Sequence, residues 1–409
     1  MEQITNNSKI IEDVLESGCI PKKRSLEIEE LEFNYSNKKI MNEENNVITK
    51  FIKDDGTIIW FKNGIKHRDN DEPALVSLNG TKKWYFNGVL HRDGDKPAVV
   101  MHNGDQVWYY HGVIHRDNDL PAVIDKDGPI KWYKNGINHR DGDNPAVIKP
   151  CGTKIWYVNN KIHRDNNSPA VVCSSGTMKW YQNGLIHRDG DEPAIIKSCG
   201  TKIWYKNNKI HRDNDLPAII DITGTQKWYK NGLIHRDDDK PAIIKFDGTK
   251  LWFQNNKVHR DNDKPAKIKN NGHMMWYNQG LLHRDNDMPA IIQPFHLFEW
   301  YQYDKKHRDN DLPALIYCYQ IDQDYFMNQK WDLYWYKNGY KHRDNDNPAI
   351  MYENYQCVWY QNDQIYRANN KHCKIINKDY YDITFNIIRR KHLYLFEYNF
   401  NTAKKLYGY

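Results

Sequence analysis

Apolar and polar positions alternate in one phrase that is repeated along most of the chain. Residues 84–100 state it: three aromatic residues, an Asn-Gly pair, two apolar residues, His-Arg, a polar D-x-D-x-P stretch and Ala-Val-Val. A fixed period of roughly 20 to 50 residues predicts a stacked repeat array. The His-Arg core recurs at a step of 24 residues and returns once after an insertion, at His67, His91, His115, His139, His163, His187, His211, His235, His259, His283, His307 and His342.

The Asn87-Gly88 pair predicts a tight turn between two strands. Such dipeptides accept the positive φ angles of a two-residue hairpin turn, and the turn fixes which residues face each other. The aromatic and apolar partners of the hairpin should then share a face, with Trp and His on one side and Tyr and the apolar residue on the other. The predicted pairs are Phe86 with Val89, Tyr85 with Leu90, Trp84 with His91, and Lys83 with Arg92.

The D-x-D-x-P stretch should leave the strand ladder, because proline has no N–H to donate and Asp favours turns capped by its side chain. Two apolar residues and a Gly-Thr turn, as at Gly200-Thr201, lead into the next repeat. We therefore predict an all-β fold, an elongated antiparallel β-hairpin array. Two strands added per repeat at a spacing of about 4.8 Å give about 120 Å for 13 repeats. The alternative is a β-solenoid with one 24-residue coil per repeat, about half as long.

A longer period lies on top of the first. The residue before Trp alternates between Lys and an apolar residue, as in Lys179 and Ile203, and the turn alternates between Asn-Gly and Asn-Asn. The repeating unit in the middle of the array is thus 48 residues. Either pairs of repeats were duplicated together, or neighbouring hairpins meet different surroundings, such as an apolar contact in every second repeat.

The repeat pattern divides the chain into segments. Residues 33–50 look like a degenerate capping repeat, because the end of an array needs a less adhesive edge. The predicted segments are an N-terminal tail or short helix (1–32), the degenerate cap (33–50), eleven 24-residue repeats (51–316), an insertion (317–332), one full and one degenerate repeat (333–368) and a C-terminal β cap (369–409).

Composition fits a thin, well-solvated array. Apolar residues make up 39% and charged residues 27% of the chain, and the mean hydropathy is −0.91. The apolar runs are too short for a membrane span or a signal peptide, so we expect a cytoplasmic protein. Seven cysteines without a C-x-x-C pair indicate free thiols. A formal charge of +6 indicates no class of partner.

Two motifs resemble sites with chemistry. His-Arg-Asp resembles the catalytic loop of protein kinases, but the magnesium-binding Asn five residues after that Asp is Ala98 here. Asp69-Asn70-Asp71 resembles the start of a calcium loop, yet Ala74 stands where such a loop needs Gly. We therefore expect no enzyme activity, no cofactor and no metal, with a calcium-binding array as a lesser alternative.

The Trp/His row is the candidate interaction or structural face. We predict that each His stacks on the Trp of its partner strand, and that a row of imidazoles would loosen the array near pH 5–6. The residues of this face are Trp84, His91, Trp108, His115, Trp132, His139, Trp180, His187, Trp228 and His235. The candidate turn-capping pairs, in which Asp also meets Arg of an adjacent strand, are Arg92, Asp93, Asp95, Arg212, Asp213 and Asp215.

The phrase W-Y-x-N-G-x-x-H resembles the MORN repeat, whose usual form is Y-x-G-x-W-x-N-G-x-x-H-G-x-G. Asn87, Gly88 and His91 match it, whereas Arg92-Asp93 and Pro97 depart from it, so the chain is similar to a divergent MORN-like array over residues 51–367. It is also similar to Lys/Asn/Ile-rich repeat proteins of giant amoeba-infecting viruses. The resemblance implies an elongated scaffold or dimeriser, in some cases at membranes, and no reaction.

The expected function is a non-enzymatic scaffold that binds protein partners, with a homo-oligomer as one form. Binding to anionic phospholipid is the alternative, because Lys161, Lys209 and Lys257 lie near the turns. Nucleic acid is not expected, since acidic neighbours offset these lysines.

Overall fold

The computed structural model describes residues 39–41, 47–294, 296–319, 330–353 and 356–367. Every helix or strand within these ranges is a β-strand, and the strands follow one another as hairpins, which confirms the predicted all-β hairpin array. The predicted N-terminal tail (1–32) and C-terminal cap (369–409) lie outside the described residues.

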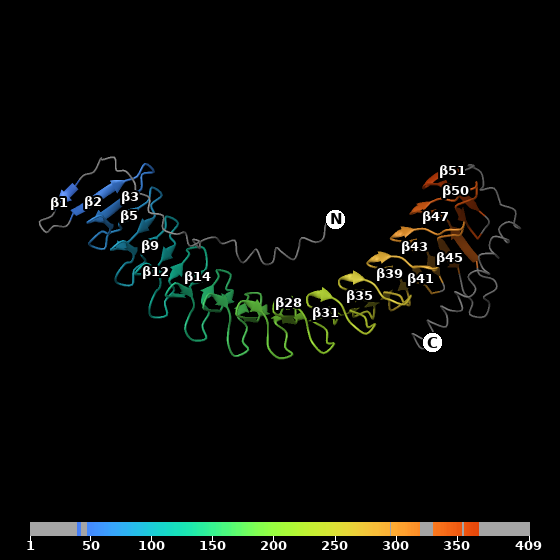
Figure 1. The fold of residues 1–409 in the computed structure, drawn as a ribbon, viewed down its shortest axis with the longest axis horizontal. Coiled ribbons are helices and arrows are strands. Elements are labelled where there is room, and N and C mark those ends of the chain that lie inside the picture. Colours follow the sequence, from blue (N-terminus) through green and yellow to red (C-terminus); the bar gives the residue numbers. More distant parts are fainter. Residues whose placement is uncertain (1–38, 42–46, 295, 320–329, 354–355, 368–409) are drawn as a thin grey trace.

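One long antiparallel sheet runs the length of the molecule (Figure 1). It takes up two strands from each repeat, and each strand pairs with the strands before and after it. We call it the main sheet. Its continuous ladder consists of β1 (Lys39–Met41), β2 (Val47–Ile52), β3 (Ile58–Lys62), β5 (Leu75–Val76), β6 (Lys82–Lys83), β9 (Val99–Val100), β10 (Gln106–Val107), β13 (Val123–Ile124), β14 (Ile130–Lys131), β17 (Val147–Ile148), β18 (Lys154–Ile155), β21 (Val171–Val172), β22 (Met178–Lys179), β25 (Ile195–Ile196), β26 (Lys202–Ile203), β29 (Ile219–Ile220), β30 (Gln226–Lys227), β33 (Ile243–Ile244), β34 (Lys250–Leu251), β37 (Lys267–Ile268), β38 (Met274–Met275), β41 (Ile291–Gln293), β42 (Leu297–Glu299), β45 (Leu315–Tyr319), β46 (Lys330–Tyr334), β49 (Ile350–Met351) and β50 (Cys357–Gln361), with β4 (Ile65–Lys66) on β3 and β51 (Gln364–Arg367) on β50.

A row of short hairpins runs along one edge of the main sheet. Each is a two-stranded sheet of its own that closes on the two-residue turn of its repeat. We call these the tip hairpins. They are β7 (Tyr85–Phe86) with β8 (Val89–Leu90), β11 (Tyr109–Tyr110) with β12 (Val113–Ile114), β15 (Tyr133–Lys134) with β16 (Ile137–Asn138), β19 (Tyr157–Val158) with β20 (Lys161–Ile162), β23 (Tyr181–Gln182) with β24 (Leu185–Ile186), β27 (Tyr205–Lys206) with β28 (Lys209–Ile210), β31 (Tyr229–Lys230) with β32 (Leu233–Ile234), β35 (Phe253–Gln254) with β36 (Lys257–Val258), β39 (Tyr277–Asn278) with β40 (Leu281–Leu282), β43 (Tyr301–Gln302) with β44 (Lys305–Lys306), and β47 (Tyr336–Lys337) with β48 (Tyr340–Lys341).

Each repeat is a single hairpin whose returning strand makes an excursion. Tyr85 pairs with Leu90 as the turn chemistry predicts. Residues 91–98 then leave the ladder at Trp84 and rejoin it at the same residue: the His91 N–H donates to the Trp84 carbonyl at 3.2 Å, and the Trp84 N–H donates to the Ala98 carbonyl at 2.8 Å. The predicted Lys83–Arg92 pair is wrong, because after this excursion Lys83 pairs with Val99 instead.

The turns join neighbouring hairpins as well as the two strands of one hairpin. Asn87 and Gly88 have φ values of 47° and 82°, the left-handed region that Asn and Gly accept most readily. The Gly88 N–H then donates 2.9 Å to the Lys66 carbonyl of the preceding hairpin. The row of tip hairpins is therefore bonded together across repeats in addition to the main sheet.

The apolar clusters follow the longer period. Val107 is buried between Val99 and Val123 of the flanking strands, and Tyr109 packs against the group. A second cluster forms 48 residues later around Ile155. This confirms the interpretation that an apolar contact recurs in every second repeat, because Lys occupies the equivalent position in the repeats between.

The sheet broadens toward the end of the array. β45 and β46 have five residues each and pair from Leu315↔Tyr334 to Tyr319↔Lys330, so the described ends of the 317–332 insertion lengthen this hairpin. Trp331 and Leu333 belong to the largest apolar cluster, which runs from Trp252 to Trp359. At the other end, β1 pairs with β2, and β2 with β3, within the predicted degenerate cap and first repeat.

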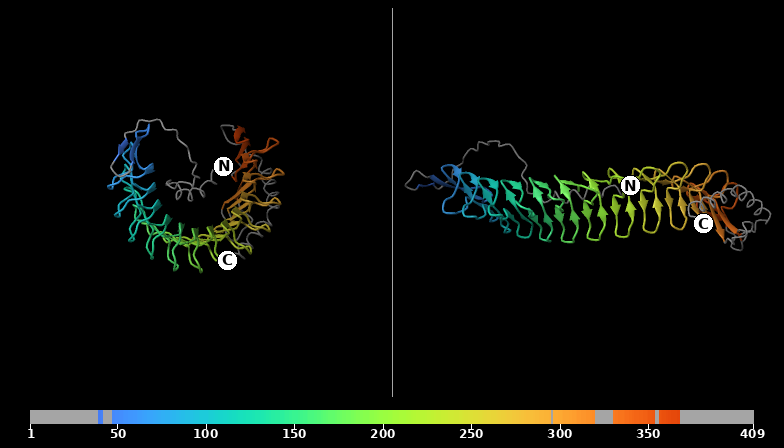
Figure 2. Two further views of the ribbon diagram at one scale, coloured as in Figure 1. Left: turned by 60° about the vertical axis from the view of Figure 1, so that its left-hand side comes forward. Right: turned by 90° about the horizontal axis from the view of Figure 1, so that it is seen from below.

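The array bends into an arc. Figure 1 shows the two ends raised on the same side, and Figure 2 shows the bend from two further directions. The successive strands of the main sheet are antiparallel throughout the ladder, two per repeat, whereas a solenoid coil stacks one strand on the same strand of the next coil. The architecture is therefore the predicted hairpin array and not the solenoid alternative.

Candidate interaction surface

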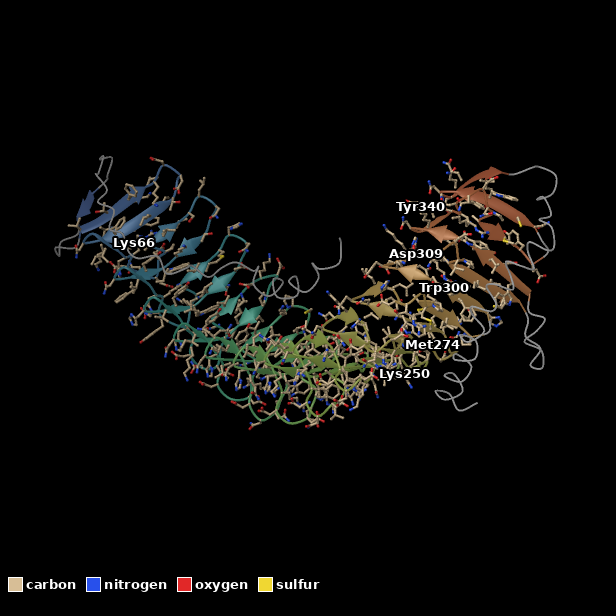
Figure 3. All side chains as sticks on the ribbon, turned by 45° about the vertical axis from the view of Figure 1, so that its right-hand side comes forward. Lys66, Lys250, Met274, Trp300, Asp309 and Tyr340 are labelled. Atoms are coloured by element: carbon tan, nitrogen blue, oxygen red, sulfur yellow. The ribbon has the colours of Figure 1, made fainter. Side chains whose placement is uncertain are left out.

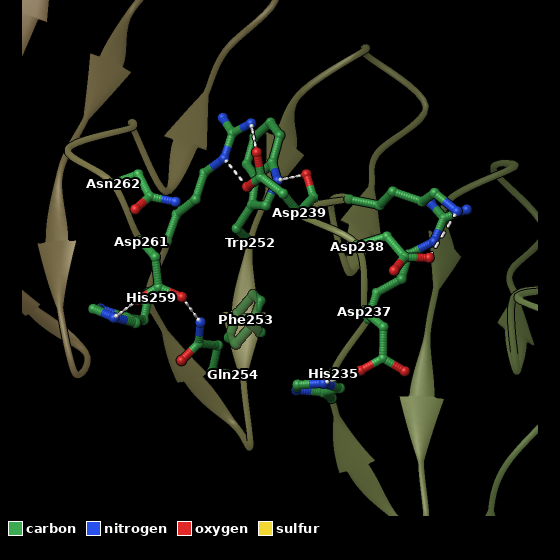
Figure 4. A pocket seen from close by; sticks show the side chains of 13 residues that line it. His235, Asp237, Asp238, Asp239, Trp252, Phe253, Gln254, His259, Asp261 and Asn262 are labelled. Carbon is green, nitrogen blue, oxygen red and sulfur yellow. Dashed lines mark hydrogen bonds and ion pairs between the residues drawn. The ribbon is translucent and has the colours of Figure 1, made fainter.

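Trp, Arg and Asp form the contact between consecutive repeats, which we call the junction. In the junction of Figure 4, the Trp252 Nε1–H donates 2.9 Å to the Asp239 carbonyl. Arg260 donates to both carboxylate oxygens of Asp239, at 2.6 Å and 3.0 Å. The Arg260 guanidinium also lies 3.9 Å from the centre of the Trp252 ring, within cation–π range. One carboxylate of repeat n thus anchors the Trp–Arg stack of repeat n+1.

The same junction recurs along the array. Arg92 binds Asp71 of the preceding repeat, Arg116 binds Asp95, and Arg236 binds Asp215. The predicted pairing of Asp with Arg of a neighbouring repeat is therefore present at Asp95, Asp215, Arg92 and, through Asp191, Arg212. A single junction among those described differs: Arg188 meets Asn167, through one bond of 2.7 Å.

The first Asp of D-x-D has a different partner, the His of its own repeat. His91 Nε2 lies 3.1 Å from Asp93 Oδ1, and His211 Nε2 lies 2.9 Å from Asp213 Oδ1. The imidazole also reaches the next repeat, since the Asn231 N–H donates to His211 Nδ1 at 3.2 Å. Because Nδ1 accepts, the proton of the neutral ring sits on Nε2 and points at the carboxylate.

The prediction that His stacks on Trp is wrong. The ring of Trp84 is covered by the Arg92 guanidinium at 3.7 Å. His91 instead stacks on His111 of the next turn, with ring centres 4.4 Å apart. The residue that follows His has taken the stacking position, because the excursion turns back over Trp only after His has met its Asp.

The tryptophans of the predicted face are buried and cannot meet a partner. The exposed fractions lie between 5% and 9% for Trp84, Trp108, Trp132, Trp180 and Trp228. His91 is buried too, while His115, His139, His187 and His235 are intermediate. These ten residues hold repeats together; the surface that remains outside is made by other positions.

Opposite charge lowers the pKa of the junction carboxylates. Hydrogen bonds from Arg236 and Lys240 hold the pKa of Asp215 at about 2, and those from Arg92 and Lys96 do the same for Asp71. The pKa of Asp95 is lowered by Arg116. These groups therefore stay ionised in the folded chain well below neutral pH.

A shallow groove separates the excursions of consecutive repeats. The groove in Figure 4 has a volume of about 240 Å³ and is lined by His235, Asp237, Trp252, Gln254 and Asp261 among others. Equivalent grooves of about 160 to 300 Å³ lie at three further junctions. Their polar groups are largely engaged in the bonds above, so the grooves offer room for side chains of a partner rather than a reaction centre.

The side chain that follows each hairpin turn is exposed, and together these positions form a ridge along the tip hairpins. A Cβ built on Gly112 would lie 3.4 Å from Val89, and one on Gly136 would lie 3.0 Å from Val113, so each ridge residue covers the next turn. Side chains project along the whole arc (Figure 3). The tip ridge reads Ile65, Val89, Val113, Ile137, Lys161, Leu185, Lys209, Leu233, Lys257, Leu281, Lys305 and Tyr340.

Two aromatic residues adjoin the ridge near its start. Phe86 and Tyr110 are 40% and 54% exposed, and their rings contact His91 edge-on at 5.9 and 5.3 Å. Sequence reasoning missed both the ridge and these rings. The available signal was that Phe86 and Tyr110 stand before the turn, where most repeats have Lys or Gln, while the apolar residue after the turn has no partner on the Tyr face.

The part of the chain that the structure describes contains no group of three or more His, Cys, Asp or Glu placed to hold a metal ion. No helix in these ranges has the length and apolar character to cross a membrane. Comparison of the chain with protein-family models, with curated proteins and with solved structures finds no match.

Proposed function

We propose that this chain is a non-enzymatic scaffold that binds protein partners along its tip ridge. The observation that carries the proposal is a division of labour within each repeat. Trp, Arg, His and Asp recur at every full repeat and are used in junctions, whereas the ridge changes from apolar at Ile65 to Ile137 to alternating Lys and Leu from Lys161 onward. A uniform frame with a variable exposed edge is how repeat proteins present a binding surface.

Two further features support a scaffold. The sheet is one layer thick along the ladder, so its length yields surface rather than a deep core. The resemblance to MORN repeats, which form elongated scaffolds and dimerisers, points in the same direction. A homo-oligomer would be one form of such binding, and a cytoplasmic location fits the short apolar runs of the sequence.

Binding to anionic phospholipid is the second candidate, and the Lys–Leu part of the ridge favours it. Lys161, Lys209 and Lys257 alternate with Leu185 and Leu233, and all five are exposed. Cationic side chains beside apolar ones suit a membrane surface that carries negative charge.

One experiment separates the two. The tagged chain is recovered from the cells that make it, after cross-linking, with washes at about 0.1 M and 0.5 M salt, and proteins and lipids are identified by mass spectrometry. We expect a defined protein to survive the high-salt wash with cross-links to the ridge lysines. Recovery of acidic lipid alone, lost at high salt, would overturn the scaffold in favour of the second candidate.

A further inference from the structure

The first Asp of D-x-D usually holds a cation from its own repeat. While His occupies Oδ1, the residue seven positions earlier reaches Oδ2: Lys134 Nζ lies 2.7 Å from Asp141, Lys230 Nζ 2.9 Å from Asp237, and Lys337 Nζ 2.9 Å from Asp344. Lys62 and Lys206 make the same bond, and Gln182, Gln254 and Gln302 donate an amide N–H in place of the ammonium. The array thus contains its own description of what this carboxylate binds.

Two consecutive repeats lack that internal cation. Phe86 and Tyr110 stand at the position of the lysine, so Asp93 and Asp117 keep only the bond from their His to Oδ1. Their side chains are 87% and 75% exposed, and Asp93 is the most exposed of the twelve equivalent carboxylates. Each Oδ2 is left to solvent beside an exposed aromatic ring.

The surroundings of these two carboxylates are apolar. Ile65, Val89, Val113 and Ile137 form the start of the tip ridge, with exposed fractions between 37% and 50%. Exposed apolar side chains that gather in one place, rimmed by polar groups, mark interaction sites. We call the six residues Ile65, Phe86, Val89, Tyr110, Val113 and Ile137 the tip patch.

We propose that the tip patch binds a basic amphipathic helix of a partner protein, whose Lys or Arg side chains take the place of the missing lysine at Asp93 and Asp117. The cation would meet the carboxylate as Lys134 meets Asp141, and the exposed ring of Phe86 or Tyr110 adds a cation–π contact. Apolar side chains of the helix would cover the ridge between the two carboxylates.

Spacing selects a helix over an extended strand. Asp93 and Asp117 are one repeat apart, which is two main-sheet strands or about 10 Å. Seven residues of an α-helix rise about 10.5 Å and return to the same face, so cations at i and i+7 match this step with apolar residues at i+3 and i+4 between them. In an extended strand, residues about 10 Å apart point to opposite faces.

The test uses a designed peptide and the full chain. The probe is a fluorescent helix of three seven-residue units, each with one Lys and two Leu at the spacing given above; its control carries Glu for each Lys. We expect saturable binding of the Lys peptide by fluorescence anisotropy at about 0.1 M salt. The variant F86K/Y110K installs the residue that five other repeats already carry, so it should fold normally and weaken binding at least tenfold by supplying the cation internally.

A matched control adds the same residue elsewhere. Gln254→Lys with Gln302→Lys places two lysines at the same position of distant repeats and should leave the affinity within about twofold. Equal affinity of the wild type and F86K/Y110K for the Lys peptide, or equal affinity of the wild type for the Lys and Glu peptides, would overturn the inference. So would self-association that F86K/Y110K abolishes in sedimentation velocity, or recruitment to vesicles with about 30% phosphatidylserine that the same variant abolishes, if the peptide does not bind.

This inference rests on the proposed function, and the two can fail separately. If the cross-linked chain retains no protein at high salt, the scaffold itself is refuted. If it retains a protein equally well with F86K/Y110K and with the wild type, the scaffold stands and only the assignment of the tip patch is lost.

Discussion

A single carboxylate joins two neighbouring repeats through three contacts. The side chain of Asp215 binds Arg236, its carbonyl accepts the Trp228 Nε1–H, and Arg236 covers the Trp228 ring. At the one described exception, Asn167 offers Arg188 one acceptor in place of two charged ones. The array therefore contains a weaker junction of the same geometry as its neighbours.

Exchanging Asp and Asn at these positions should move stability in opposite directions. We expect Asp215→Asn to lower the free energy of unfolding by about 1 kcal/mol, since a bidentate charged pair becomes a neutral contact and the pair is partly exposed. Asn167→Asp should raise it by a similar or smaller amount. Urea denaturation followed by tryptophan fluorescence measures both.

Asp238→Asn is the matched control for this pair. Asp238 is in the same excursion, and most repeats have Asn at its position. Its side chain contacts Lys240 only at 3.5 Å, so the urea midpoint should stay unchanged. Equal shifts for Asp215→Asn and Asp238→Asn would show that the junction carboxylate has no special role.

At the scale of the hairpin, the two kinds of turn bond to the preceding repeat differently. In an Asn-Gly turn, the Asn231 N–H donates to His211 Nδ1. In an Asn-Asn turn, the Asn208 side chain accepts the Ile186 N–H at 2.6 Å while the Asn208 N–H donates to the Ile186 carbonyl. The Nδ1 of His187 is then buried without a partner. The 48-residue period is thus also a period in hydrogen bonding.

This difference predicts which substitutions the second turn residue accepts. Asn208→Asp should be close to neutral, because Asp304 and Asp363 make the same bond to the preceding strand. Asn208→Ala should cost about 2 kcal/mol, since it removes that bond and places alanine at a φ of 65°. Thermal unfolding of the two variants is the measurement. A loss for Asp as large as that for Ala would contradict this account of the turn.

The sequence predicts the hairpins well because their chemistry is local. The Asn87-Gly88 turn sets the Tyr85–Leu90 pair, and proline forces the excursion out of the ladder. Whether His91 or Arg92 covers Trp84 depends on where the excursion turns back, which no local rule decides. The tip patch escaped prediction for a different reason: Phe86 and Tyr110 read as strand residues, and their exposure follows only from the absence of a covering layer on the tip hairpins.

The arc belongs to the whole molecule and was not predicted. Every repeat makes the same junction, so a small rotation at each one is repeated with the same sign and accumulates along the sheet. The bend is visible in Figures 1 and 2. Because each repeat contacts only its neighbours, stability is distributed over the junctions and none of them acts as a single core.

The distributed junctions make acid the condition under which they weaken together. The carboxyl pKa of Asp71, Asp95, Asp119, Asp143, Asp191, Asp215 and Asp239 is lowered by the Arg of the next repeat. A carboxylate with a lowered pKa contributes stability that is fully present above its unfolded value near 4, and this contribution is lost as the pH falls through the folded value. For Asp71 and Asp215 that value is about 2.

Stability should therefore fall between pH of about 4 and 2, and it should do so in one steep transition because seven carboxylates share it. Urea midpoints measured from pH 7 to pH 2 by tryptophan fluorescence report the junctions directly, since each Trp lies against an Arg that its neighbour's Asp holds. A decline that begins at pH 5–6 would instead assign the pH dependence to the histidine row. A midpoint that is flat down to pH 2 would mean that the Arg–Asp pairs are too well solvated to stabilise the array.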